Sequence, residues 1–445
     1  MNPIGVVICN YNKKDFVLQC VQSVLESKEK KFDIYVVDNA SSDGSAEALK
    51  KAYGNRITVI ENKENLGGSG GFNTGLRIVR DKGYSYFMCL DDDAAVDENA
   101  LSVLYHYMEE HTDTGMAGCR VYHTQMPDYI QQSGLLIDFD NCTAKTIGAD
   151  MPEDGSLPDV IECDTVATCA VMVRADAVKQ NGVGIMPEDN FIYWDDMEWG
   201  YRIKLAGYRV VTLAEAKALH QMGANTKKEN TFINYYMWRN RTNFFMRFTP
   251  EAQMEAMSVK VLGAVFDAMY ESMFREEHNV RQTISYAFYD AMAGVRGKAD
   301  SYKIMKNDAN DNKLIQTLQG RKSFAIEENN QEEDAYYLRN FIASVCPDLK
   351  EEEQTKAEIV FRFCDYIFYS EKMPDGKEIL IDSERNCVVD ENDIEICKNY
   401  NYSKWLFIYM NQGVFLAAAR RMRGEIVDEE EIYAFPGGKE ESIDA

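Results

Sequence analysis

Apolar and polar positions follow a regular pattern over the first 110 residues or so of the chain. Short apolar runs, typical of buried strands, lie at 4–9, 32–37, 57–61 and 86–90. Between and after them, apolar residues recur at three- and four-residue spacing, which is typical of helices. Strands that alternate with helices predict a sheet of mainly parallel strands with right-handed crossovers.

Three of these apolar runs end in polar clusters: Asn10–Asn12, Asp38–Asn39 and Asp91–Asp93. The carboxyl ends of parallel strands form the edge at which ligands bind in open α/β sheets. Alternate residues of an extended segment point the same way, so Asp91 and Asp93 can converge while Asp92 points elsewhere. Two convergent carboxylates favour Mg²⁺ or Mn²⁺. The alternative for this cluster is a solvated acidic turn.

A glycine-rich turn follows the third predicted strand, at 64–73. Its spacing differs from the GxGxxG fingerprint of dinucleotide-binding folds, which also follows the first strand, so a dinucleotide oxidoreductase is disfavoured. We expect these glycines to let the backbone approach a ligand closely. Flexible linkage is the alternative.

A second acidic motif, Asp195–Asp196, directly follows the aromatic run 190–194. It comes after a strand predicted over 160–173. The aromatic run, interpreted as a strand, leads into a helix that starts with two carboxylates, and a carboxylate beside rings that stack on sugars is a plausible general base. Simple helix capping by Asp195 is the alternative. Glu198 and Arg202 are spaced for an ion pair along the helix. The run 210–213 predicts a further strand that leads to His220, which could return to a metal, although lone histidines are more often structural.

The second half of the chain shows less chemistry. Aromatic residues and arginines alternate over 234–245, a pattern that suits either phosphate and sugar contacts or packing of an interdomain helix. Methionine and valine recur at helical spacing over 254–273. A polar stretch over 299–335 precedes renewed apolar groups. We expect three parts: a domain over 1–245, a helical extension over 246–330, and a small α or α+β accessory domain over 331–445.

Composition narrows the class of protein. The chain has 445 residues and a formal net charge of −25, which disfavours nucleic acid and bare anionic membranes as partners. The eleven cysteines form no CxxC pair and suit a reduced, cytoplasmic compartment. Met1 leads directly into a strand, so no signal peptide is expected. No apolar stretch is long enough for a transmembrane helix.

The ordered motifs NYN at 10–12, VDNASSDGS at 37–45, NLGGSGGFN at 65–73, LDDD at 90–93 and WDD at 194–196 resemble family 2 glycosyltransferases. The glycine-rich and WDD blocks are most similar to the galactofuranosyltransferase branch, with rhamnosyltransferases close by. The resemblance covers roughly residues 1–245. It implies an α/β GT-A fold, the nucleotide-diphospho-sugar transferase fold, with a mixed, mainly parallel sheet flanked by helices. A mainly helical C-terminal region would follow.

The resemblance also assigns roles to individual residues. Those expected to hold the nucleotide-sugar donor are Asn10, Tyr11, Asp38, Asn65, Gly67, Gly71, Asp91 and Asp92. The divalent metal, Mn²⁺ or Mg²⁺, would be bound by Asp91, Asp93 and His220. Asp196 would be the catalytic base, with Asp195 as the alternative. Acceptor contacts are expected from Trp194, Glu198 and Trp199.

The implied reaction is inverting, metal-dependent transfer of galactofuranose or rhamnose from a UDP- or dTDP-linked donor to a glycan or lipid-linked acceptor in surface polysaccharide synthesis. Such an enzyme would work in the cytoplasm, and peripheral contact with the inner face of the cell membrane and homo-oligomerisation through the C-terminal region stay open. A sugar-nucleotidyltransferase is one alternative, but it needs a basic, glycine-rich loop after the first strand, where this chain has Asn10–Lys14. A non-catalytic carbohydrate-binding protein is another, but it would not need both acidic motifs.

Overall fold

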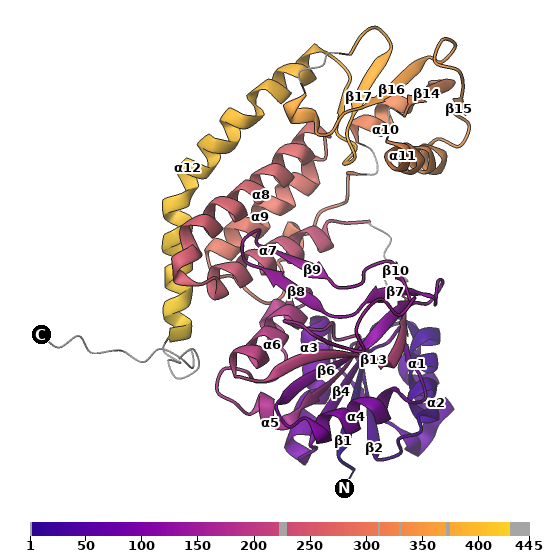
Figure 1. Ribbon diagram of the computed structural model, residues 1–445, viewed down its shortest axis with the longest axis vertical. Coiled ribbons are helices and arrows are strands. Elements are labelled where there is room, and N and C mark those ends of the chain that lie inside the picture. The colour runs from indigo at the N-terminus through magenta and orange to yellow at the C-terminus, as the bar shows by residue number, and fades with distance from the viewer. Residues whose placement is uncertain (1, 222–228, 310–311, 329–330, 371–373, 428–445) are drawn as a thin grey trace, which may run out of the picture.

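A computed structural model describes residues 2–221, 229–309, 312–328, 331–370 and 374–427. Figure 1 shows a large sheet with its helices at the N-terminal end of the molecule and a bundle of long helices beyond it. A second, smaller sheet lies at the far end of these helices. Within the described residues, no helix combines the length and the apolar character needed to cross a membrane.

The four N-terminal strands lie side by side and parallel in the large sheet, in the order β4-β1-β2-β3. They are β1 (Ile4–Asn10), β2 (Phe32–Asp38), β3 (Thr58–Glu61) and β4 (Tyr86–Asp91). These are the strands predicted from the apolar runs. Their carboxyl ends, with the polar clusters, therefore meet at one edge of the sheet.

The other half of the large sheet mixes directions. Here β12 (Ala170–Arg174) runs antiparallel to both β4 and β6 (Thr114–His123), and β13 (Arg209–His220) runs parallel to β6. Strands β1 to β4, β6 and β13 thus share one direction, so the predicted mixed, mainly parallel sheet is confirmed. The sheet is completed by β5 (Ala94–Val96), β7 (Tyr129–Gln132), β10 (Met151–Pro152) and β11 (Val160–Glu162).

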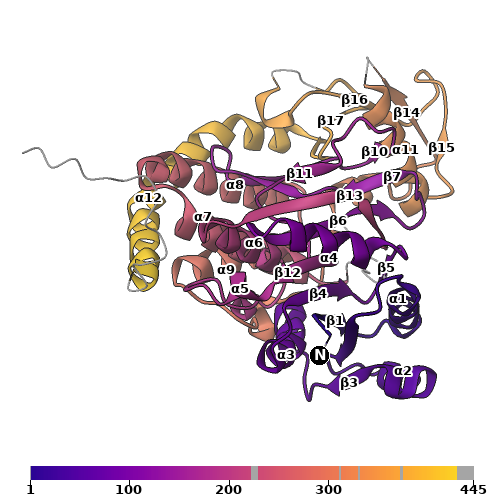
Figure 2. The ribbon, with the colours of Figure 1, turned by 60° about the horizontal axis from the view of Figure 1, so that its bottom comes forward.

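Helices cover both faces of this sheet because its strands are apolar on both sides. On β1, Val6 packs with α1 (Lys14–Glu26) in one core, and its neighbour Val7 packs with α3 (Gly67–Lys82) in the other. The first core also holds α2 (Ser45–Tyr53) and α4 (Ala100–Glu110), and the second holds α6 (Asp195–Leu205). Figure 2 shows the sheet between these two helix layers.

Three predicted elements differ from the observed ones. The strand predicted over 160–173 is two strands. The first, β11, pairs with β13, and residues 163–169 then connect it to β12, which pairs with β4. The aromatic run 190–194 is a loop rather than a strand. The glycine-rich segment is the first two turns of α3, where close packing compensates for the weak helix propensity of glycine.

The C-terminal part contains both helices and a sheet. Packed together are α7 (Phe232–Phe248), α8 (Met254–Phe274), α9 (His278–Met292) and α12 (Glu391–Val427). The second sheet has the order β15-β14-β16-β17-β18, with bounds Lys350–Glu351, Ser323–Glu327, Ile359–Phe363, Glu378–Ile381 and Cys387–Val388. It packs with α10 (Lys313–Leu318) and α11 (Glu332–Val345). The predicted helical C-terminal region is confirmed. The predicted boundaries stay predictions, and α7 runs past residue 245 while β14 begins before residue 331.

The remaining elements are short. A two-stranded hairpin of β8 (Leu135–Asp138) and β9 (Thr143–Thr146) packs against the aromatic residues of α7. Single turns of helix are α5 (Ala175–Val178), η1 (Gly54–Arg56), η2 (Glu188–Asn190), η3 (Glu251–Gln253), η4 (Ser301–Lys303) and η6 (Ile367–Tyr369).

Candidate active site

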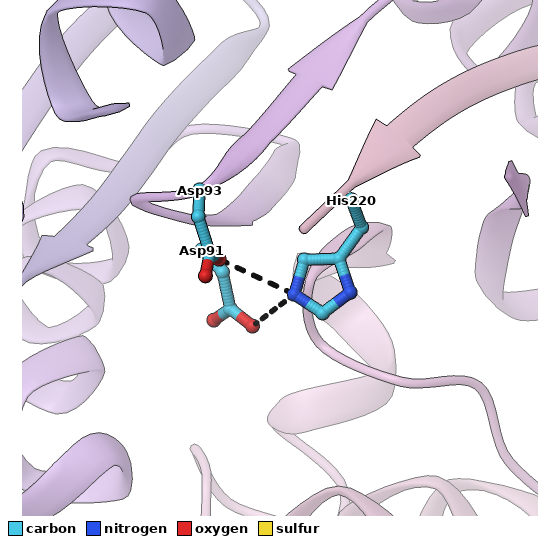
Figure 3. Close-up of side chains that lie close together, drawn as sticks. All are labelled: Asp91, Asp93 and His220. Atoms are coloured by element: carbon cyan, nitrogen blue, oxygen red, sulfur yellow. Dashed lines mark ion pairs between the residues drawn. The ribbon is translucent and has the colours of Figure 1, made fainter. Parts of the chain in front are cut away.

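Two carboxylates and one imidazole meet at the carboxyl edge of the large sheet. One ligand atom from each of Asp91, Asp93 and His220 lies within 4.8 Å of the other two. The Nε2 atom of His220 is 3.2 Å from Asp93 Oδ1 and 3.8 Å from Asp91 Oδ2 (Figure 3). The strand pairing explains this meeting: His220, at the end of β13, lies opposite Ala94 of β5, the residue after Asp93.

The chemistry of this cluster fits a divalent cation. Asp93 Oδ1 is buried, and no donor among the described residues meets it in full hydrogen-bond geometry, although His220 Nε2 lies 3.2 Å away. The Nδ1–H of His220 donates to Gln131 Oε1 at 2.7 Å, which leaves the Nε2 lone pair directed toward the carboxylates. Metal-binding histidines typically have such a partner on the second nitrogen. Carboxylate and imidazole ligands together suit Mn²⁺ and related ions.

The protonation states of Asp91, Asp93 and His220 depend on one another. Burial raises the pKa of Asp91. Burial opposes ionisation of Asp93 as well, but His220 and Lys13 together hold the pKa of Asp93 below its ordinary value. Burial likewise disfavours the His220 cation, yet Asp93 and Asp91 raise the pKa of His220. The three groups therefore hold a site in which positive charge is strongly favoured.

Lys13 belongs to the site, although the sequence pattern did not single it out. Its Nζ lies 2.6 Å from Asp93 Oδ2 and 3.1 Å from Asp92 Oδ1. Asp92 also accepts a hydrogen bond from the backbone N–H of Tyr11 at 3.0 Å, and burial raises the pKa of Asp92 to about 7. A lysine three residues past the end of the first strand was the available signal, because it must lie at the same sheet edge as Asp91–Asp93.

The polar ends of β1 and β2 also meet, as predicted. The Nδ2 of Asn10 donates to Asp38 Oδ2 at 3.2 Å and to Ser41 Oγ at 3.1 Å. Asn10 and Asp38 are buried, whereas the side chain of Tyr11 is half-exposed at the edge of the site. The arrangement combines one open aromatic ring with buried polar groups that are held by hydrogen bonds.

The glycine-rich start of α3 is held close to neighbouring segments. A Cβ on Gly67 would lie 2.1 Å from the backbone oxygen of Phe191, and one on Gly71 would lie 2.4 Å from Cys9 Sγ. Asn65 Oδ1 accepts from the Gly67 N–H at 2.8 Å and from Asn39 Nδ2 at 3.1 Å. These glycines thus allow close packing within the chain, and their expected approach to a ligand stays a prediction.

The Asp195–Asp196 pair begins α6 next to that glycine-rich turn. Asp195 is buried and accepts a hydrogen bond from Ser69 Oγ at 2.8 Å. Asp196 is half-buried, and its side chain accepts from the Met197 N–H at 2.7 Å. Burial and the charge of Asp195 raise the pKa of Asp196 to about 7, and burial raises that of Asp195. The charge of Asp91 also raises the pKa of both Asp195 and Asp196, so both acids lie within electrostatic reach of the cluster of Asp91, Asp93 and His220.

The loop before α6 is strained and held in place by α7. Phe191, Tyr193 and Trp194 all have φ between 62° and 69°, a left-handed conformation that costs a non-glycine residue about 1–3 kcal/mol. The Nδ2 of Asn240 on α7 donates at 2.9 Å to the carbonyls of Asn190, Ile192 and Tyr193. This fixed, strained loop aims the start of α6 toward α3.

The three residues expected to contact an acceptor lie inside the protein. Trp199 is fully buried and donates from Nε1 to the Gly184 carbonyl at 3.0 Å, and Trp194 packs against two phenylalanines of α7. Glu198 is buried with its three partners Arg202, Arg247 and Arg296 at 2.5, 2.7 and 3.0 Å. Although burial opposes it, these arginines hold the pKa of Glu198 well below its usual range. In this conformation a sugar cannot stack on the Trp199 ring.

Comparison with known proteins finds a family match for the N-terminal part of the chain. Residues 5–178 match the family model "Glycosyl transferase family 2". A teichoic acid poly(glycerol phosphate) polymerase of Staphylococcus epidermidis is 27% identical over 146 residues, which are 32% of this chain and 19% of the relative. A poly-beta-1,6-N-acetyl-D-glucosamine synthase of Staphylococcus aureus is 24% identical over 214 residues, 46% of this chain and 47% of the relative.

Among solved structures, GalNAc-T7 with UDP, GalNAc and Mn²⁺ aligns with a TM-score of 0.46 and 14% identity, over 58% of this chain and 50% of that one. The chain spans about half the length, or less, of the curated relatives described above. The match to glycosyltransferase family 2 thus covers the N-terminal part of the chain, and the large sheet with its flanking helices is the GT-A fold.

Proposed function

We propose that the protein is a metal-dependent, inverting glycosyltransferase that moves a sugar from a nucleotide-sugar donor to a glycan or lipid-linked acceptor. The observation that carries the proposal is the cluster of Asp91, Asp93 and His220, which lies within electrostatic reach of the two acids at the start of α6. Direct displacement of a nucleoside diphosphate requires two groups: a cation site and a nearby carboxylate whose pKa lies close to neutral pH.

The donor side of the site would use groups at the carboxyl edge of the sheet. Tyr11 offers a half-exposed side chain, and Asn10 and Asp38 offer polar groups that are held by hydrogen bonds at the ends of β1 and β2. Asn65 and the backbone of Gly67–Gly71 would complete the nucleotide pocket. Lys13, now paired with two aspartates, would have a diphosphate within reach once a cation satisfies Asp93.

Asp91, Asp93 and His220 would hold the metal, and Asp92 would support the donor through Tyr11 and Lys13. When bound, a divalent ion neutralises the charge that develops on a leaving diphosphate. Gln131 fixes the imidazole of His220 with Nε2 free for ligation, so it acts as a positioning residue.

Asp196 would be the general base. A base works best when its pKa lies near the working pH, and the pKa of Asp196 is about 7. Its carboxylate is half-buried, and among the described residues its hydrogen-bond donor is the backbone N–H of Met197. One oxygen can therefore accept a proton from an acceptor hydroxyl. Asp195 is buried and bonded to Ser69, an arrangement that suits a positioning role. The acceptor oxygen would attack the anomeric carbon from the side opposite the leaving group while Asp196 takes its proton. This direction of attack gives inversion.

The sugar and the pathway rest on resemblance. The motifs resemble galactofuranosyl- and rhamnosyltransferases, and two relatives are named for teichoic acid and poly-N-acetylglucosamine synthesis. We therefore infer that the product belongs to a surface polysaccharide. The enzyme would use cytoplasmic UDP- or dTDP-linked sugar, with its acceptor at the inner face of the cell membrane.

A donor panel tests the proposal. Thermal shift with UDP- and dTDP-sugars, each with Mn²⁺, with Mg²⁺ and with chelator, should show a metal-dependent rise in Tm for one donor class. The same donor should then be hydrolysed slowly without acceptor. Formation of a nucleotide-sugar from nucleoside triphosphate and sugar phosphate would instead indicate a nucleotidyltransferase. Sugar binding without any donor turnover would indicate a carbohydrate-binding protein.

A further inference from the structure

The long C-terminal helix α12 leaves a continuous apolar face uncovered. Its inner face packs against α7, α8 and α9 through Ile408, Phe415 and Ala419. Figure 1 shows α12 along the outer edge of the helical region, with neighbours on one side. The side chains exposed on the outer side include Tyr402, Trp405, Leu406, Tyr409, Met410 and Val414. We call this set the α12 stripe.

The α12 stripe is large for the surface of a soluble protein. Tyr409 is 82% exposed and Tyr402 71% exposed, and Leu406, the least exposed of the six, is 44% exposed. Together the six side chains offer on the order of 700 Å², taking roughly 200 Å² for a large ring. This exceeds the largest apolar patch of about 300–600 Å² on a typical monomer. It approaches the ~800 Å² that each partner buries in a standard protein interface.

The exposed positions of α12 within and beside the stripe carry no charge. From 399 to 417 every exposed position of the helix is uncharged, in a chain of which 27% is charged. Helices that lie on membranes carry lysine and arginine beside the apolar face, and the net charge of −25 repels anionic lipid. A protein surface of the same apolar kind is therefore the favoured partner.

The order of residues along the α12 stripe suits a second copy of the same helix. Seam positions fall at 395, 399, 402, 406, 409, 413, 416 and 420, with the 3- and 4-residue steps of a coiled-coil contact. A two-fold axis between 407 and 408 makes this series its own antiparallel complement. Tyr402 then lies opposite Gly413, so a large side chain meets the smallest one, and Leu406 lies opposite Tyr409.

From size and area together, we infer that the α12 stripe is the interface of an antiparallel, two-fold symmetric homodimer. This inference concerns assembly and does not depend on the transfer reaction.

Sedimentation velocity of the full-length protein between about 0.5 and 50 µM tests the inference. The wild-type protein should sediment as a dimer that dissociates on dilution, and Trp405→Glu/Tyr409→Glu should be monomeric throughout. The matched control is Tyr336→Glu/Tyr337→Glu on α11, where both rings are similarly exposed, and it should remain dimeric. A wild-type monomer at every concentration overturns the inference, as does a stripe variant that stays dimeric. Binding to anionic vesicles that the stripe variant loses would assign the surface to membrane instead.

Two further variants test the register. Leu406→Cys should form a disulfide between copies on mild oxidation, because its axial offset from its symmetry mate is about 4.5 Å. Tyr402→Cys should not, because its mate is about 16 Å away along the axis. Efficient cross-linking through Tyr402→Cys would overturn the antiparallel arrangement.

Discussion

The edge of the large sheet and the outer face of α12 both hold groups in environments that cost free energy, but of opposite kinds. At the sheet edge, polar groups are buried: no described donor meets Asp93 Oδ1 in full hydrogen-bond geometry, and burial raises the pKa values of Asp91 and Asp196. On α12, apolar rings such as Tyr409 are exposed to water. Within the described parts of the chain, the cluster at the sheet edge is the one group suited to a metal.

The difference teaches what kind of partner each region needs. An unsatisfied buried carboxylate is relieved by a cation or by a proton, so the sheet edge points to metal, donor and acceptor. Exposed rings are relieved by another apolar surface. Several charged side chains of the C-terminal part are already paired, as Lys404 is with Asp267 at 2.7 Å and Lys313 with Asp393 at 2.5 Å. We therefore expect variants at the two regions to fail in different assays.

The largest expected effect is that of Asp93→Ala. Loss of this ligand should lower Mn²⁺ affinity by at least about 10²-fold and remove most metal-dependent donor binding, because a fixed anion is lost from the site. Calorimetric titration of Mn²⁺ with nucleoside diphosphate measures this. Glu98→Ala, an exposed carboxylate nearby, is the control and should bind normally. Unchanged affinity in Asp93→Ala would remove the metal assignment.

Asp196→Asn should leave donor affinity nearly unchanged and lower kcat by about 10²–10⁴, or roughly 3–5 kcal/mol of transition-state stabilisation. Since the base must be ionised and the pKa of Asp196 is about 7, wild-type kcat should fall as pH drops through 7. The residual activity of Asp196→Asn should lack this pH step. Asp195→Asn should cost less. A collapse in Asp195→Asn with near-normal turnover in Asp196→Asn would transfer the role to Asp195.

The same raised pKa predicts a change in stability. The folded state disfavours the ionised form of Asp196, so the protein loses stability as pH rises from about 4 through 7. Asp196→Asn removes this loss. The variant should therefore have a higher Tm than wild type at pH 8 and an equal Tm near pH 4, as measured by scanning calorimetry. Equal Tm values at both pH values would contradict a raised pKa.

Gln131→Ala should weaken Mn²⁺ binding by about 10–100-fold, the usual range for loss of a hydrogen bond to a metal-binding histidine. The fold and kcat at saturating metal should change less, because the three ligands remain. Mn²⁺ titration is the measurement. Gln132→Ala is the matched control on the same strand, since its side chain donates to Cys169 Sγ instead. Equal Mn²⁺ affinities of the two variants would exclude the positioning role.

The smallest effect on the active site is expected from the core of α12. Phe415 is fully buried among the helices, so Phe415→Ala should cost about 3–5 kcal/mol of unfolding free energy. Mn²⁺ affinity of the remaining folded protein should equal that of wild type. Denaturant unfolding and calorimetry test the two halves of this prediction. A large loss of metal affinity would show that the two regions are coupled.

The sequence by itself determined the N-terminal half of the fold and the acidic pair of the metal site. Apolar runs such as 4–9 and 86–90 become β1 and β4 because each is buried on both faces, and local pattern reports that burial. Asp91 and Asp93 do come together, as predicted, but residues 92–93 form a turn between β4 and β5, so the expected alternation of extended backbone is not the reason. These properties depend on near neighbours in the chain, which a pattern can show.

Only the tertiary structure decided the rest of the site. His220 joins Asp93 because β13 pairs with β5, and Lys13 joins because β1 pairs with β4. Gln131 reaches His220 across 89 residues of chain. The loop at 191–194 could not be predicted because its left-handed backbone is held by Asn240, 47 residues or more away. Trp199 was expected at a sugar and lies in the core, because only the packed structure shows which face of α6 is covered.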